Sequence, residues 1–118
     1  MTKVTFNKNH KEVLDSILLN LPEVKEGKMF GYPAYYVHGK LFACVIEDGV
    51  CIKSPEDTVQ KLLEEKKAVP FERMGRKMRE WVQLDRRNSK DYIKDKIIFK
   101  QSAEYVLSLT KRRRKANA

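Results

Sequence analysis

The chain has 118 residues, a formal net charge of +9, 42% hydrophobic residues and 35% charged residues. This length fits one domain, and the composition is typical of a globular protein and excludes a wholly disordered one. No apolar run approaches the roughly 20 residues of a membrane-spanning helix, and the N-terminus lacks an apolar signal-peptide segment, so we expect a cytoplasmic protein.

The first predicted element is a helix from His10 to Leu21. Asn9 is available as its N-cap, and Pro22 stops it. The apolar residues of this segment have the i, i+3, i+4 spacing of an amphipathic helix: Val13, Leu14, Ile17, Leu18 and Leu21.

Strand-like runs follow at residues 34–37, 41–47 and 50–53. His38-Gly39 and Asp48-Gly49 separate them, and both dipeptides favour two-residue hairpin turns because glycine supplies a positive φ. Residues 23–29 are a further candidate strand of low apolar content.

The second half of the chain predicts a helix, a strand pair and a last helix. Ser54 as N-cap and Pro55 at the first helical position start a helix that runs to about residue 66. Residues 69–73 and 78–84 predict two strands, and residues 89 to about 113 predict a helix, either continuous or broken near 100–102.

These elements predict a two-layer α+β domain with an antiparallel five-stranded sheet, in the order α-β-β-β-α-β-β-α. We expect the domain to cover residues 1–110, followed by a basic tail at residues 111–118.

Two-residue turns would fix the register, pairing Val37 with Lys40, Tyr35 with Phe42, and Ile46 with Cys51. One predicted face is the core: Ala34, Tyr36, Leu41, Ala43, Val45, Val50 and Ile52. The other face is also largely apolar: Tyr35, Val37, Phe42, Cys44, Ile46 and Cys51.

The second face is open to three interpretations. An uncovered apolar face implies a partner, and our hypothesis is a self-association surface containing Tyr35, Phe42 and Ile46. Alternatively, the C-terminal helix buries this face within one chain. Stacking of nucleic-acid bases is a third interpretation.

Positive charge is concentrated in the second half of the chain. Residues 1–60 contain 7 Lys and Arg against 8 Asp and Glu, whereas residues 61–118 contain 18 against 8. This asymmetry favours contact with nucleic acid or another polyanion, and a solvated surface with a basic tail is the alternative.

Two basic groups are candidates for nucleic-acid contact. The first surrounds the predicted strand pair and consists of Arg76, Lys77, Arg79, Arg86 and Arg87. The single tryptophan, Trp81, lies in the same strand pair and is interpreted either as a core anchor under the C-terminal helix or as an exposed element beside this basic strip. The second closes the last helix and consists of Lys111, Arg112, Arg113, Arg114 and Lys115. One or two cations would suffice to interact with the helix dipole, so a run of five favours contact with several phosphates.

Catalytic chemistry has few candidates. Cys44 and Cys51 are predicted to lie diagonally on one sheet face as free thiols, with a redox or metal role as the alternative. His10 and His38 are interpreted as surface histidines, and Glu47 flanks a turn. The spacing of the glycines is not that of a phosphate-binding loop. We therefore assign no catalytic, metal-binding or cofactor-binding residue.

Several short motifs together resemble the N-terminal domain of the TfoX/Sxy family over about residues 10–110. They are Met29-Phe30-Gly31-Tyr32, the hairpin from Tyr36 to Ala43, Ile52-Lys53 before a helix, Pro70-Phe71, and Gly75-Arg76-Lys77-Met78 ahead of Trp81-Val82. The resemblance implies a two-layer α+β domain of the kind shared with MmcQ/YjbR-like proteins. It also implies a bacterial protein linked to regulation of competence, and it supplies no catalytic residues.

The family pattern includes a second, C-terminal domain, so we expect a stand-alone N-terminal-type domain that has kept an interaction function. The predicted function is a non-catalytic regulatory or protein-interaction module with a protein partner or a homodimer, and no membrane. A direct, mainly nonspecific nucleic-acid-binding protein is the first alternative, and a small cysteine-dependent enzyme is the second.

Overall fold

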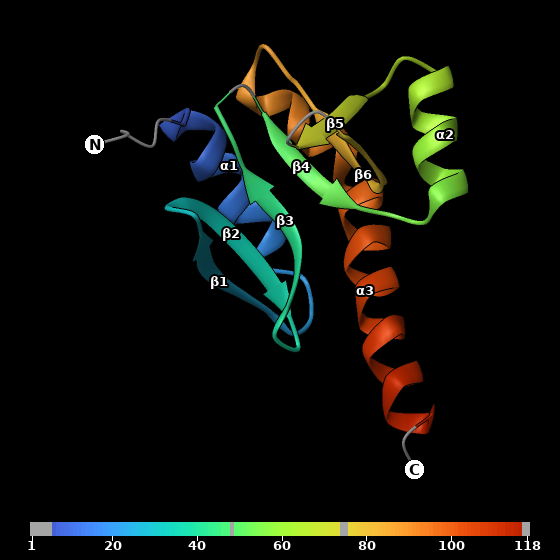
Figure 1. Cartoon of the computed structure of the whole chain (residues 1–118). Helices are drawn as coiled ribbons and strands as arrows, with labels where there is room; N and C mark the ends of the chain where they lie inside the picture. Colours follow the sequence, from blue (N-terminus) through green and yellow to red (C-terminus); the bar gives the residue numbers. More distant parts are fainter. Residues whose placement is uncertain (1–5, 48, 74–75, 117–118) are drawn as a thin grey trace.

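The structure, a computed structural model, describes residues 6–47, 49–73 and 76–116, and the side chains of these residues except 72–78 and 110–116. As predicted, it is an α+β fold of two layers, in which helices pack on an antiparallel sheet (Figure 1). The strand order across the sheet is β1-β2-β3-β4-β6-β5. The strands are β1 Val24–Met29, β2 Tyr32–Val37, β3 Lys40–Val45, β4 Val50–Lys53, β5 Val69–Arg73 and β6 Arg76–Leu84. The helices are α1 Lys8–Leu18, α2 Glu56–Glu64, a 3-10 helix Ser89–Asp95 and α3 Lys96–Ala116.

The described sheet has six strands instead of the predicted five, because the segment of low apolar content at residues 24–29 forms β1. This strand pairs with β2 along its whole length and lies at the edge of the sheet. An edge strand has one neighbour and buries less side-chain surface than a central strand, so few apolar residues are needed.

The first helix starts two residues before the predicted start. The Asn7 side chain accepts hydrogen bonds from the backbone N–H groups of Asn9 (2.9 Å) and His10 (3.2 Å), so Asn7 is the N-cap and the prediction of Asn9 was wrong. The helix ends at Leu18, before Leu21 and Pro22.

The prediction that Ser54 caps the second helix was also wrong. Ser54 is buried, and its backbone N–H donates to the carbonyl of Glu80 on β6 at 2.9 Å, so it extends the sheet pairing. Pro55 occupies the N-cap position without a side-chain hydrogen bond, and α2 starts at Glu56.

The last helical region changes type at Lys96, and not near residues 100–102. Asn88 caps the 3-10 helix by accepting from the N–H of Lys90 at 3.0 Å. Ser102 lies within α3, where its hydroxyl donates to the carbonyl of Lys53 and ties the helix to β4. The C-terminal turns of α3 extend past the sheet (Figure 1).

The register between β2 and β3 is interrupted by a bulge. Val37 pairs with Lys40 as predicted, but Tyr35 pairs with Ala43 instead of Phe42, because the register shifts between Tyr35 and Tyr36. A bulge places two residues of one strand opposite one residue of the other and changes which face the following side chains occupy. The extra residue is Phe42 on β3. The predicted faces of the β2 side chains, and those of Leu41 and Phe42 on β3, are therefore reversed.

The turn between β3 and β4 is longer than the predicted two residues. Val45 pairs with Val50, and the backbone N–H of Ile46 donates to the carbonyl of Gly49 at 2.9 Å. Consequently, Cys44 and Cys51 lie directly opposite each other instead of diagonally.

One face of the sheet and the helices form the main core. All three α-helices and the 3-10 helix contribute buried side chains to it: Leu14, Ile17 and Leu18 from α1, Val59 and Leu62 from α2, Tyr92 from the 3-10 helix, and Phe99, Ala103 and Val106 from α3. The sheet supplies Tyr35, Val37, Phe42, Ala43, Val45, Val50, Ile52, Val82 and Leu84. This face of the sheet is thus covered within a single chain.

Candidate functional site

The face of the sheet opposite the helices carries a second apolar cluster, which we call the open sheet face. All of its members come from strands or from the turn after β3: Met29, Tyr32, Ala34, Tyr36, Leu41, Cys44, Ile46, Cys51, Phe71 and Trp81. Ala34, Cys44 and Cys51 are buried at its centre, and the larger side chains around them are half-buried.

Tyr36 lies across the neighbouring edge strand. A Cβ atom added at Gly27 would come within 2.8 Å of the Tyr36 ring, and the Tyr36 hydroxyl donates to the carbonyl of Lys28 at 2.8 Å. The ring therefore occupies the space that a side chain at position 27 would need. Because glycine has no side chain to pack, an aromatic ring that covers it from the neighbouring strand stabilises the edge strand at that position.

At the other side of the open sheet face, Phe71 and Trp81 form an aromatic pair with ring centroids 6.2 Å apart. Trp81 is half-buried on the side away from α3, so the interpretation of Trp81 as a core anchor under the last helix was wrong. The alternative interpretation, in which Trp81 lies outside the core under the helices, agrees with the structure, and the exposed Arg79 lies two residues earlier on the same strand.

The residues predicted for self-association lie on both faces of the sheet. Tyr35 and Phe42 are fully buried under the helices, so they cannot form a surface in this fold and their assignment was wrong. Ile46 does belong to the open sheet face. The apolar pattern did not identify Tyr36 as a residue of this face, since the bulge between β2 and β3 leaves no mark in that pattern. Phe71 was not assigned to a surface either.

The two cysteines are buried thiols that form no disulfide with each other. The thiol of Cys51 lies 3.5 Å from the carbonyl oxygen of Cys44, to which it donates. A reactive thiol requires access and a lowered pKa, so burial supports the structural interpretation of both residues. Among the residues that the structure describes, no group of three or more His, Cys, Asp or Glu side chains is arranged to hold a metal ion.

His10 is buried, which corrects its prediction as a surface residue. A hydrogen bond of 3.1 Å joins its Nδ1 atom to the hydroxyl oxygen of Tyr92, and the two rings meet edge to face. Burial raises the pKa of Tyr92 to about 12. His38 is exposed at its turn, and its Nε2 atom contacts the carboxylate of Glu23.

Asp15 joins α1 to the sheet. Its carboxylate accepts from the Tyr35 hydroxyl at 2.5 Å and from Lys11 Nζ at 2.7 Å, and Lys11 also reaches Glu26 on β1 at 2.9 Å. The hydrogen bond to Asp15 raises the pKa of Lys11, and burial together with the same carboxylate raises the pKa of Tyr35. This network positions a helix and carries no nucleophile.

The structure describes three of the basic side chains predicted around the β5–β6 hairpin, and these three do not form one cluster. Arg79 lies five residues, or roughly 17 Å of strand, before the end of β6, and Arg86 and Arg87 follow that end. Arg86 is half-buried in a bidentate ion pair with Asp95 (2.9 and 3.2 Å), whereas Arg87 is exposed. The side chains of Arg76, Lys77 and residues 111–115 lie outside the described ones.

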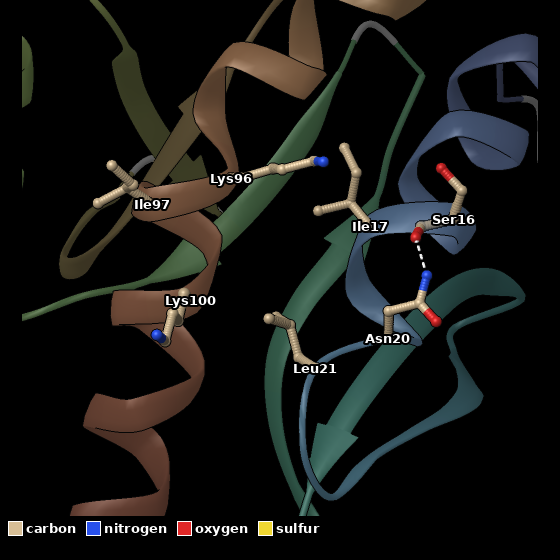
Figure 2. A pocket seen from close by; sticks show the side chains of 7 residues that line it. All are labelled: Ser16, Ile17, Asn20, Leu21, Lys96, Ile97 and Lys100. Atoms are coloured by element: carbon tan, nitrogen blue, oxygen red, sulfur yellow. Dashed lines mark hydrogen bonds between the residues drawn. The ribbon is translucent and has the colours of Figure 1, made fainter.

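A groove of about 300 Å³ lies between α1 and α3 (Figure 2). In Figure 2, Ile17 and Leu21 extend toward α3, and Lys96 extends toward α1. The groove is lined by Ser16, Ile17, Asn20, Leu21, Lys96, Ile97 and Lys100. Sequence reasoning missed this groove, because its residues come from two helices far apart in the sequence.

The fold defines a small two-layer α+β domain whose sheet has one helix-covered face and one open face. The chain belongs to the TfoX N-terminal domain family, because the model of that family matches residues 16–105. This membership fits a regulatory or interaction module in general terms. The comparison with curated proteins returns no match, and neither does the comparison with solved structures. Within the described residues, no helix has the length and apolar character that crossing a membrane requires.

Proposed function

We propose that this chain is a non-catalytic regulatory module that binds a protein through its open sheet face, and that the partner is a second copy of the chain. The observation that carries the proposal is the aromatic and apolar face that no described helix covers. Soluble monomers rarely expose large contiguous apolar patches, and Tyr and Trp are enriched at protein interfaces. Regulation of competence or of transcription is the process that we propose for it, on the basis of family membership.

The margins of the open sheet face support a second copy as the partner. Lys25 pairs across the strands with Tyr36, and Lys53 pairs with Trp81, so both lysines lie on this side of the sheet. Glu47 is also there, where it accepts from the Tyr32 hydroxyl at 2.8 Å. In a two-fold contact a patch meets its own copy, so margins with both signs of charge are compatible with self-association.

Sedimentation equilibrium of the full chain tests this proposal. We expect the apparent mass to rise above 13.9 kDa as the concentration increases through the micromolar range, with a blue shift of Trp81 fluorescence. Ile46→Lys, at the open sheet face, should remain monomeric. Leu19→Lys is the matched control, because Leu19 is exposed on the helix layer. A strict monomer at high micromolar concentration would exclude the second copy as the partner.

A second candidate function is nonspecific nucleic-acid binding. The observation that favours it is the extension of α3 past the sheet, where its last turns carry the basic run of residues 111–115 (Figure 1). A basic run on a projecting helix can approach phosphates without hindrance from the domain. Each phosphate contact adds sequence-independent affinity that falls as the salt concentration rises.

Electrophoretic mobility shift with generic duplex and single-stranded DNA tests this candidate at about 50 and 200 mM salt. We expect binding at the lower concentration that is lost at the higher one. Replacing Arg112, Arg113 and Arg114 with Gln should weaken it, whereas replacing Lys61, Lys66 and Lys67 with Gln removes equal charge elsewhere and should have little effect. Equal losses in the two triple variants would show that net charge, and not the tail, causes binding.

A further inference from the structure

The groove between α1 and α3 has an unusual combination of an apolar wall and a basic rim. Ile17 and Leu21 form the apolar side next to α1. Ile97 lies at the α3 edge of the groove, and its side chain extends away from α1 (Figure 2). Ile97 is 71% exposed, although isoleucine is among the residue types most often buried in proteins. Ile93, in the 3-10 helix before α3, is 48% exposed. The helix layer therefore presents apolar surface to solvent at a site that is separate from the open sheet face.

The charge at this groove has one sign. Lys96 and Lys100 lie one turn apart on α3, and both are exposed. Within the described part of the chain neither lysine forms an ion pair, and the lining contains no Asp or Glu. Complementary charge steers partners and selects among them, so the two ammonium groups favour a partner that carries carboxylates.

From this geometry we propose that the α1–α3 groove binds an acidic amphipathic helix of a partner protein. Apolar side chains of that helix, spaced i, i+3 or i+4, contact Ile17 and Leu21 in the groove and the exposed Ile97 at its α3 edge. Its Asp or Glu side chains meet Lys96 and Lys100. In helix-in-groove recognition, an amphipathic helix places anchors at helical spacing into an apolar groove.

The test uses the full chain and a synthetic helical peptide of about 14 residues, or roughly four turns, with Leu at i, i+3, i+4, i+7 and Glu on both flanks. Its binding is followed by fluorescence anisotropy of a dye on the peptide. A peptide of the same composition with its Leu periodicity scrambled measures the attraction of any acidic chain to a protein of charge +9, including attraction to the basic residues 111–115.

We expect the periodic peptide to bind and the scrambled peptide to bind at least about tenfold more weakly. Ile97→Ser should weaken binding by about tenfold, and the double variant Lys96→Glu, Lys100→Glu should weaken it at least as much. The double variant Lys61→Glu, Lys66→Glu is the matched control, since it makes the same charge change on and after α2 and should bind normally. Thermal unfolding of each variant shows whether the fold is kept, and Ile97 is exposed enough for the substitution to be tolerated.

Three results would overturn the proposal. The first is no binding of the periodic peptide, and the second is equal binding of the periodic and scrambled peptides. The third is self-association that is abolished by Ile97→Ser and unchanged by Ile46→Lys, which would assign the groove to a second copy of the chain. Because Ile46 and Ile97 lie on opposite layers, failure of this proposal is distinguishable from failure of the proposed function.

Discussion

A single ion pair, between Arg86 and Asp95, helps to join the helix layer to the sheet. The Arg86–Asp95 ion pair connects the end of the sheet to the 3-10 helix, and both side chains are largely shielded from water. A carboxylate that loses its cation in such a place remains with an unpaired charge. The loss of one partner therefore costs more than the net contribution of the pair.

We expect Arg86→Met to lower the free energy of unfolding by about 3 kcal/mol, as measured by urea denaturation. Methionine keeps most of the apolar stem of the arginine but leaves Asp95 without its charge partner. The adjacent Arg87→Met is the control, because Arg87 is exposed, and it should change stability by less than about 0.5 kcal/mol. Equal effects at the two positions would mean that the ion pair contributes nothing particular.

Alkaline pH should destabilise the fold. An unfolded tyrosine loses its proton near its ordinary pKa of about 10, whereas burial raises the pKa of Tyr92 to about 12. Between these values the unfolded chain binds fewer protons than the folded chain, so the stability present below pH 10 is lost as the pH rises toward 12. The raised pKa of Tyr35 acts in the same direction.

The measurement is the urea midpoint of the chain and of Tyr92→Phe between about pH 9 and 11.5. Phenylalanine lacks the hydroxyl that ionises, so the variant should start less stable, having lost the contact with His10, but should lose less on alkalinisation. Parallel pH profiles would exclude Tyr92 as a source of the alkaline loss.

At the level of elements, the positions of helices and strands could be predicted from the sequence better than their ends and faces could. The hairpin at His38-Gly39 has the expected Val37–Lys40 pair because a positive φ is required there, and Gly39 adopts +78°. The β2–β3 bulge could not be predicted, because residues on both sides of these strands are apolar. Alternation assigns faces only where one face is polar.

The candidate site was partly predictable for the same reason. The existence of a second apolar sheet face follows from the number of apolar residues in β2, β3 and β4, but its members depend on the bulge and on the length of the turn at Ile46–Gly49. The groove depends on the angle at which α1 meets α3, which neither helix determines alone.

The α1 cap gives a sharp test at this scale, since the two candidate asparagines are only two residues apart. Asn7→Ala should lower the free energy of unfolding by about 1 kcal/mol, because two N–H groups of the first turn lose their acceptor. Asn9→Ala should be nearly neutral, since alanine is favourable inside a helix. The opposite ranking in thermal or urea unfolding would place the helix start at Asn9.

Across the whole molecule, the open sheet face is part of the folded structure and not a loose surface. Its central thiols are buried by neighbouring strand side chains, with Cys44 at 5% exposure and Cys51 at 3%. A reagent can reach them only when the strands separate or the surrounding side chains move. Their reactivity therefore reports on opening of the sheet.

We expect a chromogenic thiol reagent to react with the native chain roughly a thousandfold more slowly than with the chain in denaturant. Both thiols should react together as denaturant increases, because they lie opposite each other on adjacent strands. One thiol that reacts rapidly under native conditions would contradict the buried geometry and would revive the interpretation as a cysteine-dependent enzyme.

The contact between Gly27 and Tyr36 has a consequence for sequence variation within the family. A methyl group at position 27 would collide with the aromatic ring at position 36, so a larger residue at 27 is compatible with the fold only if the residue at 36 becomes smaller. The two positions should therefore change together over evolutionary time. Relatives that keep an aromatic residue at 36 should keep glycine at 27, while those without the ring should be free to carry a side chain on the edge strand.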